Sequence, residues 1–161
     1  MKKRDIVIGL IILAALAGII FWARKPQETL EVPHIPSVEE KMEGIFNLEI
    51  PEDTEKAQLE DVSGGDASGI ATRSYENGGF SHVVLADLPD PEEGFFYQGW
   101  LVKGAMEDKD FISTGKMILV KGGYLLEFES DIDYSEYEGV VISLEKIDDE
   151  EPEKHILEGQ F

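Results

Sequence analysis

Residues 121–129 read Lys-Gly-Gly-Tyr-Leu-Leu-Glu-Phe-Glu, and this stretch predicts the fold class most directly. Tyr124, Leu126 and Phe128 occupy alternate positions, and both glutamates fall on the other set of positions. A period of two is typical of a strand that buries one face and leaves the other largely in water. The preceding glycines suit a tight turn because glycine adopts positive φ without steric cost. We therefore expect a β-hairpin here.

The same pattern of strands and turns continues on both sides of this stretch, where apolar runs alternate with clusters of Gly, Asn, Asp and Pro. Asn77-Gly78-Gly79 forms a second good hairpin turn. The expected strands are residues 57–62, 69–75, 80–87, 95–103, 115–120, 124–129, 140–146 and 155–161. Short strands without a long helix between them predict an all-β fold, an antiparallel β-sandwich of about eight strands over residues 57–161.

The N-terminus predicts a membrane anchor. Residues 6–23 carry no charge, and 18 helical residues span roughly 27 Å, about the hydrocarbon thickness of a bilayer. Trp22 falls near the expected lipid–water boundary, where Trp is favoured. We therefore expect a short stub at residues 1–5 and one transmembrane helix at residues 6–23, through which the chain contacts the lipid bilayer.

The flanking charges predict the orientation of this helix. Lys2, Lys3, Arg4 and the amino terminus outnumber Arg24 and Lys25, so the N-terminus is expected in the cytoplasm. The protein would then be a single-pass protein of the cell membrane with an extracytoplasmic C-terminal domain. The alternative is a cleaved signal peptide with a site at residues 15–17. An anchor is favoured because apolar residues continue after that site.

Residues 24–56 are expected to form a tether that contains a short helix. Three prolines, at positions 26, 33 and 36, indicate a semi-extended chain. Ser37 and Glu40 then have the spacing of a capping box. Four apolar residues would share one helical face: Val38, Met42, Ile45 and Phe46. We expect this amphipathic helix to pack on the domain, and the alternative is that it binds a partner.

Acidity and the lack of cysteine exclude several functions. The formal net charge is −20, and residues 26–161 alone carry −24, from nine Lys and Arg against 33 Asp and Glu. Such a surface repels nucleic acid and anionic lipid headgroups but remains compatible with cations or basic proteins. The alternative is that the acidity serves solubility alone. With no cysteine, the chain has no disulfide, thiolate metal site or cysteine nucleophile.

The histidines predict neither a metal site nor a catalytic pair. His34, His82 and His155 are far apart in the sequence, without the spacing of a zinc site. Ser81 precedes His82, but adjacent residues of a strand point to opposite faces and cannot form a nucleophile–base pair. We therefore expect no catalytic residue, no metal and no cofactor, and the protein is predicted not to be an enzyme.

Three loops have a composition that suggests ligand binding. Residues 63–69 are glycine-rich, but they lack the Gly-Lys-Ser/Thr ending of a phosphate loop. Residues 131–135 begin like a calcium loop, yet Glu136 and Ile142 occupy the positions where an EF-hand needs Gly and Glu. A weak Ca²⁺ site there remains the alternative. Residues 148–153 are acidic and are interpreted as a solvated connection.

A family resemblance rests on five stretches that occur in the expected order. They are residues 88–94, 97–102, 113–117, 140–145 and 157–161. The most specific is Tyr97-Gln98-Gly99-Trp100-Leu101, which is similar to a signature of Tyr-Gln, a variable residue and Trp-Leu. In these stretches, residues 57–161 resemble the C-terminal extracytoplasmic domain of the anti-sigma-K factor family. Gly99 departs from the pattern, which usually has a larger apolar residue at that position.

The resemblance implies a fold, a location outside the cytoplasm, and a role in sensing or protein binding. Full-length members of that family carry a cytoplasmic sigma-binding domain before the membrane helix, which residues 1–5 are too few to form. The hypothesis is a non-enzymatic sensing or interaction module whose partner is an envelope or membrane protein. One alternative is an accessory regulator of a separate anti-sigma/sigma system, acting through the membrane helix. Another is a carboxylate-dependent envelope hydrolase.

Overall fold

The computed structural model describes residues 36–104 and 109–161. The predicted stub at 1–5, the predicted membrane helix at 6–23, His34 and the first part of the predicted tether lie outside these residues. In the part that is described, no helix has both the length and the apolar character needed to cross a bilayer. Residues 36–161 form one compact unit that contains the short helix and all the described strands.

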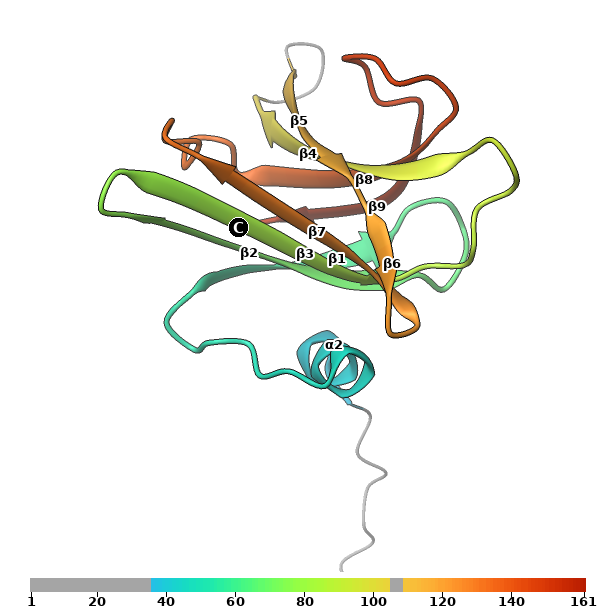
Figure 1. The fold of residues 1–161 in the computed structure, drawn as a ribbon, viewed down its shortest axis with the longest axis horizontal. Coiled ribbons are helices and arrows are strands. Elements are labelled where there is room, and N and C mark those ends of the chain that lie inside the picture. The colour runs from blue at the N-terminus through green and yellow to red at the C-terminus, as the bar shows by residue number, and fades with distance from the viewer. Residues whose placement is uncertain (1–35, 105–108) are drawn as a thin grey trace, which may run out of the picture. The chain divides into compact units, whose positions relative to one another are not determined.

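The described chain is mostly β, with nine strands and one short helix. The elements are α2 (Val38–Phe46), β1 (Glu55–Asp61), β2 (Ser68–Glu76), β3 (Gly79–Asp87), β4 (Phe96–Lys103), β5 (Asp110–Lys116), β6 (Ile118–Val120), β7 (Gly123–Ser130), β8 (Gly139–Glu145) and β9 (Lys154–Gln160). All pairings are antiparallel, in the order β5-β4-β8-β9-β1-β2-β3-β7-β6 (Figure 1). The all-β antiparallel prediction is therefore confirmed.

The sheet is a single continuous one that curls until it is nearly closed, like a barrel. Its two terminal strands, β5 and β6, are separated in the chain only by Met117. Strand β5 pairs with β4, and β6 pairs with β7 on the other side of the curl. Gly115, two residues before Met117, has φ 105°, a backbone conformation that favours glycine. One bent segment therefore joins the two ends of the sheet.

Seven of the eight expected strands are confirmed, with ends within two residues of the prediction. The expected strand at residues 115–120 is wrong, because the structure divides this region into β5 and β6 and begins β5 at Asp110. The polar pair Ser113-Thr114 interrupts the apolar run in this region, so apolar runs alone do not indicate a strand that begins at Asp110. Both predicted turns are confirmed, with positive φ at Asn77 and Gly78 and at Lys121 and Gly122.

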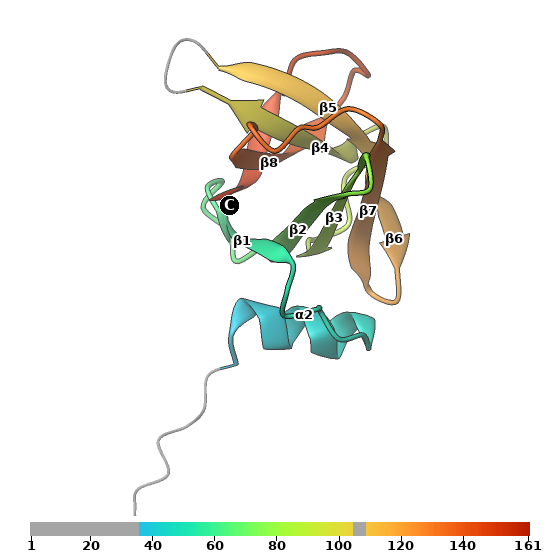
Figure 2. The ribbon, with the colours of Figure 1, turned by 90° about the vertical axis from the view of Figure 1, so that its left-hand side faces the viewer.

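Helix α2 begins as the capping box predicts. The Glu40 backbone N–H donates to the Ser37 hydroxyl at 3.2 Å, and the Ser37 N–H donates to the Glu40 carboxylate at 2.8 Å. Asn47, with φ 53°, ends the helix in the left-handed conformation. Met42 and Phe46 are buried against the outer face of the sheet, so the expectation that the helix packs on the domain is confirmed (Figure 2).

Apolar side chains form three clusters on the two faces of the sheet. The largest cluster fills the inside of the curl and includes Val84, Leu101, Leu126 and Ile142. A second lies on the outside, under α2. The third lies outside β4 and β8, where Trp100 packs with Val102, Val141 and the half-buried Phe111. Trp100 is buried, with its ring on the outer face of the sheet.

Candidate functional site

His82 lies inside the curl and is fully buried. Its Nδ1 is 3.0 Å from the Thr72 carbonyl, so the neutral ring carries its proton on that nitrogen. Its Nε2 has no hydrogen-bond partner among the described residues. Desolvation, together with the charge of Arg73, lowers the pKa of His82 to about 4 despite the hydrogen bond to Thr72. The imidazole is therefore a buried, neutral group that packs edge-on against Phe161.

The glycine-rich loop at residues 63–69 is organised by the carboxylate of Asp61. This carboxylate accepts from the backbone N–H groups of Ser63 at 2.7 Å, Gly65 at 3.0 Å and Ala67 at 3.1 Å. Desolvation raises the pKa of Asp61, but these bonds and one from the Ser63 hydroxyl lower it by more, so it lies below its ordinary value. The loop therefore directs its N–H groups at its own side chain rather than at a phosphate.

The acidic loops are also tied into local structure. Asp133 accepts from the Ser135 hydroxyl at 2.6 Å and from its backbone N–H at 2.9 Å. In the second loop, Asp148 pairs with Lys116 at 2.8 Å. Within residues 36–104 and 109–161, no three His, Asp or Glu side chains converge so as to hold a metal ion.

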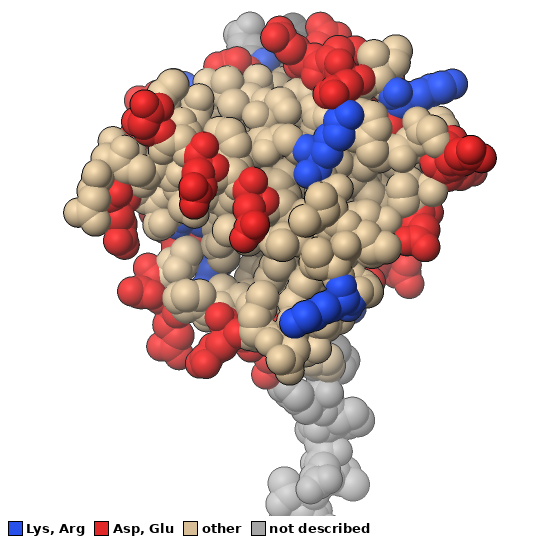
Figure 3. All heavy atoms as spheres, in the orientation of Figure 1, with Lys and Arg blue, Asp and Glu red and all other residues tan. Residues whose placement is uncertain are grey.

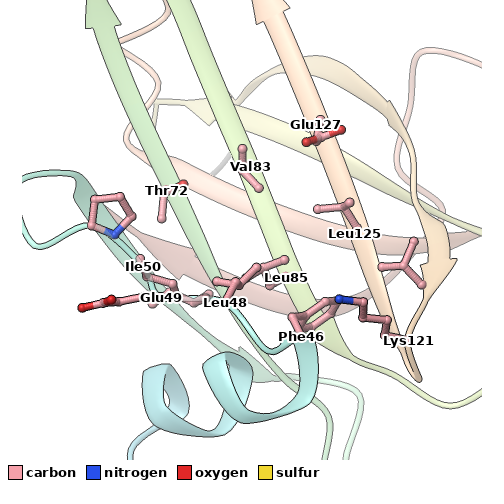
Figure 4. Close-up of a pocket in the computed structure, with 13 residues that line it drawn as sticks. Phe46, Leu48, Glu49, Ile50, Thr72, Val83, Leu85, Lys121, Leu125 and Glu127 are labelled. Carbon is pink, nitrogen blue, oxygen red and sulfur yellow. The ribbon is translucent and has the colours of Figure 1, made fainter.

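An apolar groove of about 400 Å³ lies on the outer face of the sheet beside α2 (Figure 4). Strands β2, β3 and β7 form its floor, the end of α2 and the chain after it form one wall, and the β6–β7 hairpin forms the other. The lining residues are Phe46, Leu48, Glu49, Ile50, Pro51, Ile70, Thr72, Val83, Leu85, Val120, Lys121, Leu125 and Glu127. This volume lies in the range of small-ligand sites.

Strand register builds the floor of the groove in two rows. Ile70, Leu85 and Leu125 lie side by side across β2, β3 and β7. The next row pairs Thr72 with Val83, and Val83 with Glu127. Helix α2 covers only part of the first row, because Asn47 ends it. The second row is left open, as Figure 4 shows.

The wall that follows α2 is held by a side-chain bond. The Glu43 carboxylate accepts from the Ile50 backbone N–H at 2.8 Å, which turns Ile50 inward, where it is buried. Leu48 in the same segment is 42 % exposed at the edge of the groove. The wall therefore presents apolar surface both to the groove and to the solvent beside it.

Three charged residues mark the rim of the groove: Glu49, Lys121 and Glu127. Their sum is one net negative charge, in a region of the surface rich in carboxylates. Figure 3 shows acidic side chains on both sides of a hollow next to the helix segment. A groove with apolar walls and an acidic surround favours an apolar ligand that also carries positive charge.

The sequence contains a signal for this groove, although the expected strands alone do not predict it. Ile70, Leu85 and Leu125 alternate with the inward-facing residues of their strands, so they occupy positions that a solvated face would fill with polar residues. Helix α2 accounts for part of this second apolar face. Only the strand order shows that the three residues form one floor.

Comparison with known proteins gives no relative: no family model, no curated protein and no solved structure matches this chain. The resemblance to the anti-sigma-K factor family stays a prediction from the residues quoted for it. The fold and the groove by themselves define a curled antiparallel β domain with an apolar groove on its outer face.

Proposed function

We propose that this protein is a single-pass, membrane-anchored module of the cell envelope that works by binding and not by catalysis. In this proposal residues 6–23 hold it in the bilayer, and the domain lies outside the cytoplasm. The curled sheet serves as a β-sandwich, with β5, β4, β8 and β9 as one layer and the other five strands as the second. As in the domain it resembles, its role is sensing or protein interaction.

The observation that carries the proposal is the open apolar groove. Exposed apolar surface costs free energy in water, at roughly 25 cal/mol per Å². Leu48 is exposed, and Val83 and Leu125 are only half-buried, so a ligand that covers these side chains is favoured. Catalysis would need polar groups that converge on a substrate, whereas the floor of the groove is mostly apolar and its three charged residues lie at the rim.

The charge distribution favours a polypeptide ligand with apolar and basic residues. Glu49 and Glu127 border the groove, and residues 26–161 carry −24. Long-range attraction would raise the association rate of a basic partner and would oppose pairing with a second copy of this chain. We therefore propose that the groove binds an apolar segment of an envelope or membrane protein flanked by Lys or Arg.

Site-specific photocrosslinking in native membranes tests this proposal. A photoreactive residue replaces Val83 at the open end of the groove in the full chain. The expected result is a discrete crosslinked product with one protein. That product should decrease as salt concentration rises, since the Debye length falls from about 30 Å at 0.01 M to about 10 Å at 0.1 M.

The matched control replaces Ser113, which lies on β5, outside the groove. A Val83→Trp variant, which fills the open end, should abolish a product detected from a photoreactive residue at Thr72. The proposal is wrong if positions 83 and 113 give the same products, if neither gives any, or if the groove product is unaffected by Val83→Trp.

The accessory-regulator and hydrolase hypotheses make different predictions for the same groove. An accessory regulator of a separate anti-sigma protein would give that protein as the crosslinked product. A carboxylate-dependent hydrolase needs paired carboxylates, yet Glu145 is the one buried carboxylate in the described part of the chain, and it accepts from the Glu153 backbone N–H at 3.0 Å. No specific observation favours the hydrolase.

A further inference from the structure

The β6–β7 hairpin differs in charge from the rest of the domain. Residues 111–126 contain no Asp or Glu, although residues 26–161 hold 33 of them. The same stretch contains two lysines, Lys116 and Lys121. Lys116 is paired with Asp148, whereas Lys121 forms no ion pair with any described residue. The turn end of the hairpin is therefore locally cationic, whereas Glu127 and Glu129 lie farther along β7.

The hairpin also exposes apolar side chains at its edge. Ile118 is 57 % exposed and Leu119 is 59 % exposed, and the two are adjacent on β6. The turn places Lys121 at φ 42° and Gly122 at φ 83°, which fits the two-residue type I′ hairpin. Two exposed aliphatic side chains next to a free amine have the chemistry of a segment that lies at a lipid–water interface.

The tip lies at the end of the domain where the chain joins it. Phe46, the last residue of α2, packs on Gly123, which directly follows the hairpin turn. Helix α2 separates that contact from Val38 by about 12 Å, at 1.5 Å per residue. Figures 1 and 2 both show α2 and the tip of the hairpin on the same side of the sheet.

The chain between the proposed anchor and α2 limits how far the tip can be from the bilayer. Fourteen residues lead from the end of residues 6–23 to Ser37. A chain of this length spans at most about 50 Å. The tip is thus held within reach of the membrane surface at high effective concentration, so that weak contacts are sufficient for binding.

We propose that the β6–β7 hairpin is a membrane-contact site. Ile118 and Leu119 insert at the boundary between headgroups and acyl chains, and Lys121 binds lipid phosphate. The inference rests on the membrane anchor in the proposed function. The inference adds an orientation for the domain. Val120 and Lys121 of the hairpin also line the groove, so the groove would lie beside the bilayer. A partner's basic, apolar segment next to its own membrane helix would then lie at the height of the groove.

The test measures the depth of a label at position 119. The chain has no cysteine, so Leu119→Cys carries a single environment-sensitive fluorophore in the full chain, reconstituted into lipid nanodiscs. The lipids are phosphatidylcholine alone or with phosphatidylglycerol, each with and without a spin-labelled lipid that quenches near the glycerol level. We expect a blue shift and loss of emission with the quencher, both larger with phosphatidylglycerol. Lys121→Gln should remove the effect of phosphatidylglycerol.

The control places the same label at position 129 by Glu129→Cys. This residue is exposed on β7, about 20 Å along the strand from Gly123 at the hairpin turn. Equal quenching at positions 119 and 129, or none at 119, overturns the inference while the anchor stands. A chain that does not co-elute with the nanodiscs overturns the anchor and this inference with it. A third outcome is a blue shift that occurs without quenching and that increases with the number of protein copies per nanodisc. It would show that the tip associates with a second copy of the chain, and it also overturns the inference.

Discussion

The ring of Phe46 occupies the space that a side chain at Gly123 would need. A Cβ built on Gly123 would lie 2.5 Å from Phe46 Cζ and 3.0 Å from its Cε2. Real Cβ atoms do not approach other atoms this closely. The end of α2 can therefore pack on the β6–β7 hairpin only because position 123 is glycine. Phe46 lines the groove, and Gly123 belongs to the hairpin that forms its other wall, so this contact sets the position of the two walls.

Gly123→Ala should therefore destabilise the domain, by about 1–3 kcal/mol, the usual cost of overpacking. The measurement is urea unfolding of the full chain in nonionic detergent, followed by circular dichroism. Gly44→Ala is the matched control: it lies in α2 with no atom within 4 Å of its Cβ, and it should stabilise by about 0.5–1 kcal/mol. A Gly123→Ala chain as stable as the parent would contradict the contact with Phe46.

Stability should fall in acid because of His82. Burial lowers its folded pKa to about 4 from the ordinary 6.5, so the unfolded chain binds the proton more readily. The stabilising contribution is complete above pH 6.5 and is lost as the pH falls from there to about 4. The full loss is on the order of 3 kcal/mol.

Comparison with His82→Gln isolates this effect from the many carboxylates. The difference in unfolding free energy between the parent and the variant should shrink as the pH is lowered from 7.5 to 4.5. A difference that stays constant over this range would show that His82 titrates at its ordinary pKa when folded.

Trp100 should contribute to stability through packing and through one hydrogen bond. Its indole N–H donates to the Ser143 hydroxyl at 2.7 Å, and its ring lies edge-on to Phe111. Trp100→Ala should cost about 3–5 kcal/mol. Ser143→Ala should cost less, about 1–3 kcal/mol, because it leaves a buried donor unpaired. An unchanged melting temperature for Trp100→Ala would be inconsistent with its burial.

The predicted topology can be tested on intact spheroplasts. External protease should digest the C-terminal domain and leave a small membrane-bound fragment that contains residues 6–23. A tag at the N-terminus should survive in this fragment, because the stub is expected in the cytoplasm. Protection of the whole domain would reverse the orientation, and release of the intact domain into the medium would favour a cleaved signal peptide.

Local patterns in the sequence determined the elements of this protein. Alternation of apolar and polar residues located most strands, Asn-Gly and Lys-Gly pairs located two turns, and Ser37 with Glu40 located the start of α2. These features follow from backbone dihedral preferences and from hydrogen bonds between residues two to four positions apart, so neighbouring residues are sufficient to predict them.

Tertiary structure alone decided how these elements combine. Ile70, Leu85 and Leu125 form one floor because three strands align in register, and Gly123 and Phe46 meet although 77 positions separate them. Likewise, Trp100 is buried on the outer face because Phe111 covers it. Such contacts depend on strand order and on the curl of the whole sheet. Apolar positions in a single sequence show which residues are buried, but not which of them meet.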